Sequence, residues 1–258
     1  MKKLILLSLI GFASCNPDNP EPNITNAINN ELPCVNILWN QNIDYNSVTD
    51  VDGNTYNTVI IGEQEWMAEN LKTTHYSNGD PIPYVFNGDL NGDSLWFNIS
   101  TGAYCSYLKL NNAGDTINYK DCYGLLYNWY AITDSRNICP EGWHIPSDNE
   151  WDILKEYLSD SYNSPIQTEL LKSLSGWSLY YGENFNGTDY YGFRAIPSGC
   201  RFSNGKFNYV GERSRFWRYI EEEIIRPGAV DFTNNHHVFH QGVFAMEQDG
   251  LSIRCIKD

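Results

Sequence analysis

The alternation of apolar and polar residues is clearest after Pro146, where it predicts an amphipathic helix. Ser147 and Glu150 have the spacing of a capping box, in which each side chain satisfies a backbone amide of the first turn. Apolar residues then recur every three or four positions and so share one helix face: Trp151, Leu154, Tyr157 and Leu158. We expect a helix that begins at residue 147 and buries this face. A shorter helix is expected near 167–173.

Short runs of β-branched and aromatic residues between turn signals predict strands elsewhere. Asp52-Gly53 lies between two such runs and predicts a hairpin, which continues as a strand over 58–61. Residues 65–71 fit a strand or a short helical turn, and 123–132 has helical spacing. Further strands are expected over 192–197, 206–210, 215–220 and 251–256.

The first residues have the pattern of an export signal. Two lysines precede the apolar run from Leu4 to Phe12, and small residues then lead to Cys15. The run is shorter than the about 20 apolar residues that a membrane-spanning helix needs. Phe12-Ala13-Ser14-Cys15 resembles the bacterial lipobox, with Phe in place of the usual Leu, and implies acylation of Cys15. A plain secretory signal, with Cys15 incidental, is the alternative.

Residues 16–33 are rich in Asn, Pro, Asp and Glu and predict a tether, because such a composition cannot build a core. Asp18 and Glu21 resemble the short acidic export signal of Bacteroidetes surface lipoproteins. We therefore divide the chain into a signal peptide (1–14), a tether (15–33) and a globular domain (34–258). We expect the protein at the outer membrane, anchored by lipid alone and facing the cell exterior.

Charge restricts the partners. The chain has 17 basic and 32 acidic residues and a net charge of −15. Such a surface repels nucleic acid and anionic lipid, so we exclude both as partners. With 41% hydrophobic and 14% aromatic residues, the chain can still bury a core.

The cysteine content indicates disulfides rather than a metal site. Besides Cys15 there are six cysteines: Cys34, Cys105, Cys122, Cys139, Cys200 and Cys255. An even number in an exported chain indicates three disulfides, and six cysteines allow 15 pairings, so composition leaves the connectivity open. Zinc sites need close pairs such as Cys-x-x-Cys, which the sequence lacks.

Two other segments are candidate metal-binding sites. Residues 89–93 have the Asp-x-Asn-x-Asp spacing that opens a calcium loop, but Ser94 and Ser100 replace the Gly and Glu that such a loop needs. Residues 236–240 hold three histidines, which bind zinc only when further ligands are present. A turn at 89–93 and an exposed loop at 236–240 explain these segments better than a metal does, so we expect neither a metal nor another cofactor.

Several longer motifs resemble, in order, those of the Fibrobacter succinogenes major paralogous domain family, over residues 48–258. They are Val48-Thr49-Asp50-Val51-Asp52-Gly53-Asn54-Thr55-Tyr56 with Gly62, Trp66-Met67-Ala68-Glu69-Asn70-Leu71-Lys72-Thr73-Thr74, Tyr123-Gly124-Leu125-Leu126-Tyr127-Asn128-Trp129-Tyr130-Ala131, Cys139-Pro140-Glu141-Gly142-Trp143-His144-Ile145-Pro146-Ser147-Asp148-Asn149-Glu150-Trp151, Gly192-Phe193 with Pro197-Ser198-Gly199 and Arg201, and Ser252-Ile253-Arg254-Cys255-Ile256-Lys257-Asp258. After Phe216-Trp217 the chain has Arg218-Tyr219-Ile220-Glu221 where the family usually has Ser-Ser-Thr-Glu.

The resemblance implies an α+β, C-type-lectin-like fold with small antiparallel sheets, one or two helices and long loops. It also implies that Cys139 pairs with Cys255, because the last strand of that fold returns beside the first helix. Cys105 with Cys122, and Cys34 with Cys200, are the further pairs we expect. Formylglycine-generating enzymes share the fold but need two cysteines close in sequence. Cys200 and Cys255 are too far apart to be that pair, so we expect no enzyme activity.

We therefore expect a binding module for glycan or protein; a structural surface component without a small ligand is the alternative. Lectin-like folds carry ligands on long loops, here about 177–247. Arginine beside aromatic residues is typical of binding hot spots. The expected ligand-binding residues are Tyr190, Tyr191, Arg215, Phe216, Trp217 and Arg218. Alternatively, the two aromatic side chains of 216–217 lie in the core and the arginines neutralise Glu221 to Glu223.

Overall fold

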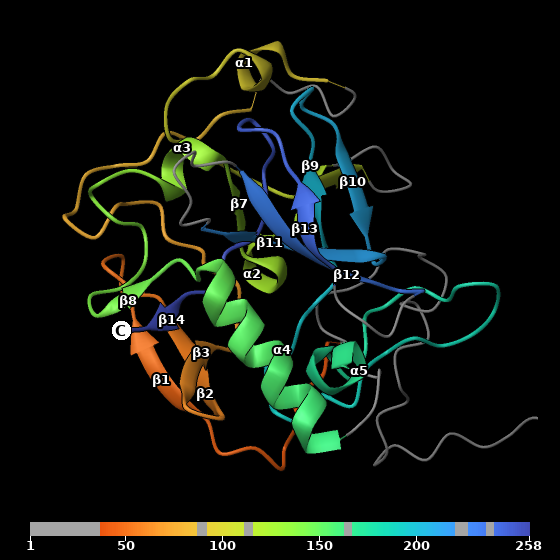
Figure 1. The fold of residues 1–258 in the computed structure, drawn as a ribbon. Helices are drawn as coiled ribbons and strands as arrows, with labels where there is room; N and C mark the ends of the chain where they lie inside the picture. Colours follow the sequence, from red (N-terminus) through yellow and green to blue (C-terminus); the bar gives the residue numbers. More distant parts are fainter. Residues whose placement is uncertain (1–36, 87–91, 111–115, 163–166, 220–226, 236–239) are drawn as a thin grey trace, which may run out of the picture. The chain divides into compact units, whose positions relative to one another are not determined.

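The computed structural model describes residues 37–86, 92–110, 116–162, 167–219, 227–235 and 240–258, all of which belong to the unit 32–258. Small sheets and short helices are intermixed along this unit, which has an α+β architecture (Figure 1). Within the described ranges, no helix has the length and apolar character needed to cross a membrane.

The first sheet joins segments from distant parts of the sequence. The hairpin predicted at Asp52-Gly53 forms its first two strands, and Val48 lies opposite Tyr56. Ile256 lies between two strands and pairs with both Trp66 and His144. In sheet order, the strands are β1 (Asn46–Thr49), β2 (Thr55–Ile61), β3 (Gln64–Met67), β14 (Ile256–Lys257) and β8 (Trp143–His144).

The second sheet contains the segment for which we predicted ligand binding. Its central strand, β11, pairs antiparallel with β12 and parallel with β9, and side chains along β11 and β12 are almost all buried. In sheet order, the strands are β10 (Phe207–Val210), β9 (Ser198–Arg201), β11 (Arg213–Arg218), β12 (Gly228–Thr233) and β13 (His240–Phe244).

The described residues also form two two-stranded antiparallel sheets and five helices. One of these sheets pairs β4 (Tyr104–Ser106) with β7 (Leu125–Tyr127), and the other pairs β5 (Leu108–Leu110) with β6 (Thr116–Asn118). The helices are α1 (Ser94–Phe97), α2 (Lys120–Tyr123), α3 (Trp129–Ile132), α4 (Asp148–Tyr162) and α5 (Gln167–Leu171).

The helical spacing of 123–132 does not produce one helix. Gly124 ends α2 with a φ of 72°, a conformation that glycine adopts without strain. Leu125 to Tyr127 then pair with β4 as a strand. Asn128 begins α3 by accepting a hydrogen bond from the backbone N–H of Ala131 at 3.0 Å. The apolar spacing was compatible with either structure, and tertiary pairing decided between them.

Helix α4 begins as predicted. The backbone N–H of Ser147 donates to Glu150 Oε2 at 2.7 Å, and the N–H of Glu150 donates to Ser147 Oγ at 3.3 Å, which is a capping box. Trp151 is fully buried and packs on Trp66 with ring centroids 4.7 Å apart. Tyr157 was expected on the same buried face but is 39% exposed.

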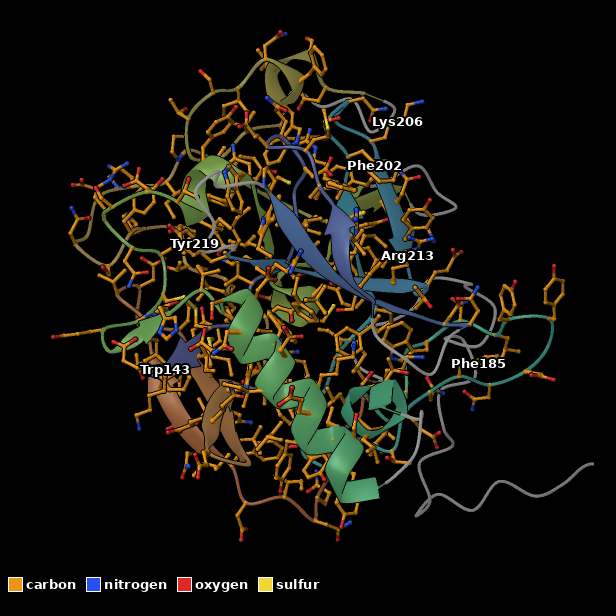
Figure 2. All side chains as sticks on the ribbon, viewed as in Figure 1. Trp143, Phe185, Phe202, Lys206, Arg213 and Tyr219 are labelled. Carbon is orange, nitrogen blue, oxygen red and sulfur yellow. A yellow bond between two sulfur atoms is a disulfide. The ribbon has the colours of Figure 1, made fainter. Side chains whose placement is uncertain are left out.

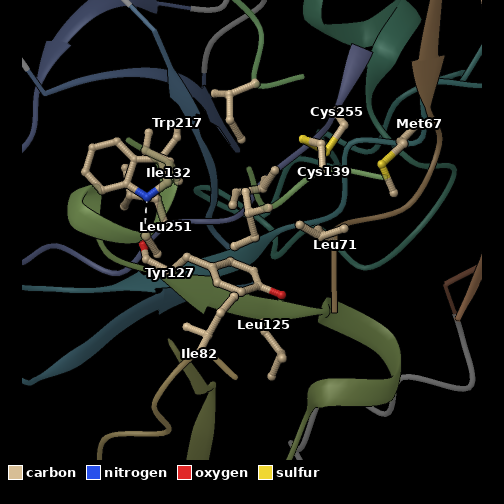
Figure 3. Close-up of a cluster of buried hydrophobic side chains, with 14 of the residues drawn as sticks. Met67, Leu71, Ile82, Leu125, Tyr127, Ile132, Cys139, Trp217, Leu251 and Cys255 are labelled. Atoms are coloured by element: carbon tan, nitrogen blue, oxygen red, sulfur yellow. Dashed lines mark hydrogen bonds between the residues drawn. A yellow bond between two sulfur atoms is a disulfide. The ribbon is translucent and has the colours of Figure 1, made fainter. Parts of the chain in front are cut away.

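One predicted disulfide is present and two are corrected. Cys139 and Cys255 are bonded, with Cα atoms 6.0 Å apart, inside a core cluster that includes Met67 and Leu71 (Figure 3). Cys105 and Cys200 are buried free thiols in two different core clusters, so neither Cys105–Cys122 nor Cys34–Cys200 forms. Cys122 is disulfide-bonded, whereas Cys15 and Cys34 lie outside the described residues.

Candidate functional site

The two aromatic residues predicted to bind ligand on β11 are fully buried. Phe216 packs on Trp151 and on Phe193, with ring centroids 6.0 Å apart in both pairs. Trp217 donates its Nε1–H to the carbonyl of Tyr127 at 2.7 Å (Figure 3). Both side chains belong to the core because β11 is a central strand with both faces covered, and this corrects the prediction that they form an exposed surface.

The flanking arginines are also buried and interact with carboxylates of the same domain. Arg215 is 5% exposed, and its Nε lies 3.8 Å from Asp231 Oδ1. Arg218 is 9% exposed and forms an ion pair with Asp148 at the start of α4. The predicted role of both arginines in ligand binding is corrected accordingly. The alternative partners, Glu221 to Glu223, lie outside the described residues.

Tyr190 and Tyr191, in contrast, reach the surface, where Tyr157 of α4 joins them. The ring of Tyr191 lies 5.7 Å from that of Tyr157 and 5.0 Å from that of Tyr190, measured between centroids. Tyr190 is 54% exposed and Tyr191 is partly exposed. We call these three side chains the tyrosine row. The sequence missed Tyr157 because helical periodicity placed it with the buried residues of α4.

Two more tyrosines, Tyr180 and Tyr181, lie at the end of a hairpin with a two-residue loop. We call this segment the hairpin tip (Leu179–Glu183). The backbone N–H groups of Tyr180 and Glu183 each donate to the other residue's carbonyl at 3.0 Å. Tyr181 and Gly182 between them have φ values of 50° and 84°, as in a type I′ turn. Tyr181 is 92% exposed, so packing within the fold does not explain a large aromatic residue in this uncommon conformation.

The loop that carries the hairpin tip is fixed at its base by Lys172. This side chain is 2% exposed, its Nζ lies 4.6 Å above the ring of Trp177, and it donates to the carbonyl of Phe185 at 3.3 Å. Phe185 is labelled on this loop in Figure 2. Burial lowers the pKa of Lys172 to about 8. A side chain at Gly187 would approach the Lys172 carbonyl to 2.2 Å, so the loop packs closely here. An anchored loop presents its exposed rings with little ordering cost on binding.

Most of the domain corresponds to one known protein family. The sequence model of the Fibrobacter succinogenes major domain matches residues 59–257. The chain belongs to this family. No curated protein and no solved structure matches the chain.

In this Fibrobacter succinogenes major domain, the motifs that carry the family resemblance are mainly structural. Arg254 donates its Nε–H to Asn70 Oδ1 at 2.6 Å, and Asn70 donates to the carbonyl of Tyr123 at 2.9 Å, so three motifs meet in one buried network. The disulfide between Cys139 and Cys255 joins two motifs. The tyrosine row and the hairpin tip lie outside all of these motifs. The family pattern therefore specifies the fold, and the segments between motifs carry the exposed rings.

Two motifs of the domain, 139–151 and 252–258, place a histidine, a serine and two carboxylates together. His144 Nε2 lies 2.8 Å from Glu150 Oε1, and Nδ1 lies 2.6 Å from Asp258 Oδ1. The hydrogen bond to Glu150, opposed by burial and aided by Asp258, raises the pKa of His144 to about 9. Ser147 Oγ donates to Glu150, not to the imidazole. Because the imidazole is protonated and donates from both nitrogens at neutral pH, it offers no general base to this serine.

This ion cluster predicts a pH-dependent stability. The pKa of His144 rises from 6.5 to about 9 on folding, so its contribution is complete below pH 6.5 and is lost as the pH rises towards 9. Because the side chain is 41% exposed, solvent screening limits the contribution to about 1 kcal/mol. We expect His144→Gln to lower the free energy of unfolding by this amount at pH 6 and by much less at pH 9.5. Urea unfolding of both proteins at the two pH values checks this, and an equal difference at both would contradict it.

Three other reactive groups of the described residues, those of Asp93, Cys105 and Cys200, are buried. Burial raises the pKa of the Cys105 and Cys200 thiols to about 11 and about 12, which keeps both protonated and poorly nucleophilic. Asp93 of the candidate calcium segment is 1% exposed and pairs with Arg201 at 2.5 Å. Residues 87–91 and 236–239 lie outside the description, and in the described remainder no three His, Cys, Asp or Glu side chains could hold a metal.

Proposed function

We propose that this protein is a surface-exposed lipoprotein whose domain is a non-catalytic binding module for glycan or protein. The observation that carries the proposal is the exposure of tyrosine rings on the tyrosine row and the hairpin tip. Tyrosine supplies a large, rigid contact area with a polar hydroxyl, which suits both sugar faces and protein interfaces. A C-type-lectin-like fold, in which loops present ligand sites, fits this arrangement.

We infer the cellular location from the N-terminal residues. The lysines, the apolar run and Cys15 support export and acylation, and residues 16–33 supply a tether. Several acyl chains on one cysteine anchor a protein stably, whereas a single chain does not. We place the domain on the outer membrane, facing the cell exterior and touching the membrane only through lipid.

The polar clusters of the described residues support a role without catalysis. His144 lacks a free basic nitrogen, and the free thiols of Cys105 and Cys200 are buried and protonated. Cys255 is bonded to Cys139 and so is not available for the cysteine pair of a formylglycine-generating enzyme.

A double variant tests the proposed binding surface. Tyr181→Asn removes the most exposed ring of the described residues and leaves Asn-Gly, the preferred type I′ turn, while Tyr190→Ala removes the most exposed ring of the tyrosine row. The protein is prepared in the Cys15→Ser background, which we expect to release it from membranes. We expect the Cys15→Ser protein to bind glycans on an array or the surface of whole bacterial cells. We expect the double variant in the same background to bind at least tenfold more weakly.

Phe97→Ala is the matched control, because Phe97 is an aromatic residue on α1 that is 57% exposed. We expect this substitution to leave binding unchanged. The alternative, a structural surface component without a small ligand, predicts that the protein binds neither the array nor the cells. Equal affinity of the double variant and the parent protein, with both folded by circular dichroism, would place the binding surface elsewhere.

A further inference from the structure

A cleft of ≈ 580 Å³ lies between the loop after β3, the segment before β4 and helix α3, and it shares no residue with the tyrosine row or the hairpin tip. Its volume falls within the range of about 300–1,000 Å³ typical of small-ligand sites. Aromatic rings, a guanidinium, a carboxylate and hydroxyls line it together: Tyr76, Tyr130, Arg136, Asp134, Ser100 and Thr101.

The ring of Tyr130 is held in place from its far end. Its hydroxyl donates to Glu247 Oε2 at 2.6 Å and accepts a hydrogen bond from Gln248 Nε2 at 3.3 Å. The bond to Glu247 is the main reason that the pKa of Tyr130 is raised, to about 12, so the hydroxyl stays protonated. The ring can therefore serve as a stacking surface without losing side-chain freedom when a ligand binds.

Arg136 is fixed on three sides. Its Nε and Nη2 donate to the two carboxylate oxygens of Asp134 at 2.8 and 2.7 Å, and its Nη1 donates to Asp80 Oδ2 at 3.1 Å. The guanidinium lies 4.0 Å from the ring centroid of Tyr76, which is fully buried beneath it. Gly102 is required here, because a side chain would approach the Tyr76 hydroxyl to 2.0 Å. The cleft thus has a rigid polar floor.

We propose that this cleft binds a neutral, hydroxyl-rich ligand, namely an uncharged oligosaccharide. Sugar hydroxyls both donate and accept, so they can pair with the carboxylate of Asp134 and the hydroxyls of Ser100 and Thr101 while a sugar face stacks on Tyr130. Asp80, Asp134 and Glu247 outnumber Arg136 around the cleft, and the whole chain carries −15, so acidic sugars are repelled. This inference rests on the proposed binding function and adds to it a second site with its own ligand class.

Isothermal titration with a defined panel tests the inference. The full chain in the Cys15→Ser background is titrated with cellopentaose, laminaripentaose, mannopentaose and xylopentaose, and with tetragalacturonate as the acidic comparison. We expect binding of at least one neutral pentasaccharide and none of tetragalacturonate. We expect Tyr130→Ala and Arg136→Met to weaken that binding at least tenfold, and Tyr130→Phe, which keeps the ring, to weaken it only two- to threefold.

The double variant of the tyrosine row and hairpin tip separates this site from the proposed binding surface. We expect it to bind the pentasaccharide with unchanged affinity. Loss of pentasaccharide binding in the double variant but not in Tyr130→Ala or Arg136→Met would overturn the cleft and leave the proposed function standing. Failure of the whole neutral panel, or preferred binding of tetragalacturonate, would also overturn the cleft.

Discussion

Arg254→Met is expected to lower the free energy of unfolding by about 4 kcal/mol or more, a large part of the 5–15 kcal/mol of a typical domain. Arg254 is fully buried and makes four hydrogen bonds, to the side chain of Asn70 and to the carbonyls of Met67, Phe193 and Arg194, at 2.6–2.9 Å. These acceptors come from both the β3 region and the loop before β9, so one guanidinium joins them.

The size of the effect follows from what remains after substitution. Methionine fills much of the space between the rings of Phe193 and Phe216 but donates no hydrogen bond, so four buried acceptors lose their donor. Each buried acceptor without a partner costs about 1–3 kcal/mol, and partial relaxation reduces the sum. Arg254→Lys keeps the charge but loses the planar donor geometry, and an intermediate loss is expected.

Urea unfolding at pH 7 with the disulfides intact measures this effect. Lys257→Met is the matched control, because Lys257 is an exposed basic residue nearby whose ion pair with Glu65 is expected to contribute less than about 1 kcal/mol. A free energy of unfolding for Arg254→Met within 1 kcal/mol of the parent protein would show that the network is not a principal source of stability.

Removal of the Cys139–Cys255 disulfide is expected to have an effect of similar size. The bond closes a loop with a sequence separation of 116 residues. In the chain-entropy model, a loop of this length restricts the unfolded ensemble enough to contribute about 4–5 kcal/mol. We therefore expect the double variant Cys139→Ala/Cys255→Ala to unfold at a much lower urea concentration.

Substitution is preferable to a reductant here, because Cys122 also takes part in a disulfide that a reductant would break. Cys200→Ala is the matched control, since it removes a buried sulfur without removing a crosslink and is expected to cost only about 1 kcal/mol. If the double variant unfolded at the same urea concentration as Cys200→Ala, the crosslink would not be the source of stability.

Local signals in the sequence were sufficient for elements whose determinants are near neighbours. The capping box of Ser147 and Glu150 and the spacing of Trp151 and Leu154 predicted α4, and Asp52-Gly53 predicted the first hairpin. The pairing of Cys139 with Cys255 came from the family resemblance instead, because no local pattern connects residues so far apart.

The misplaced residues depend on long-range partners. Arginine beside an aromatic residue is typical of an exposed hot spot, as at Arg215 and Phe216. In the fold, however, β9 and β12 flank their strand within the sheet, and Asp231 supplies the opposite charge for Arg215. The cleft around Tyr130 was not predicted at all, because its polar groups come from three separate segments of the chain. Of the predicted ligand-binding residues, the structure leaves Tyr190 and Tyr191 at the surface.

The position of β14 also affects how the domain folds. Ile256 fills the gap between β3 and β8, and Lys257 pairs with Glu65 across a sequence separation of 192 residues. Until residues 256–257 take their place in the sheet, β3 has an open edge whose backbone groups can pair with another chain. Because this closure is long-range, it slows folding and increases the time during which incompletely folded chains can aggregate.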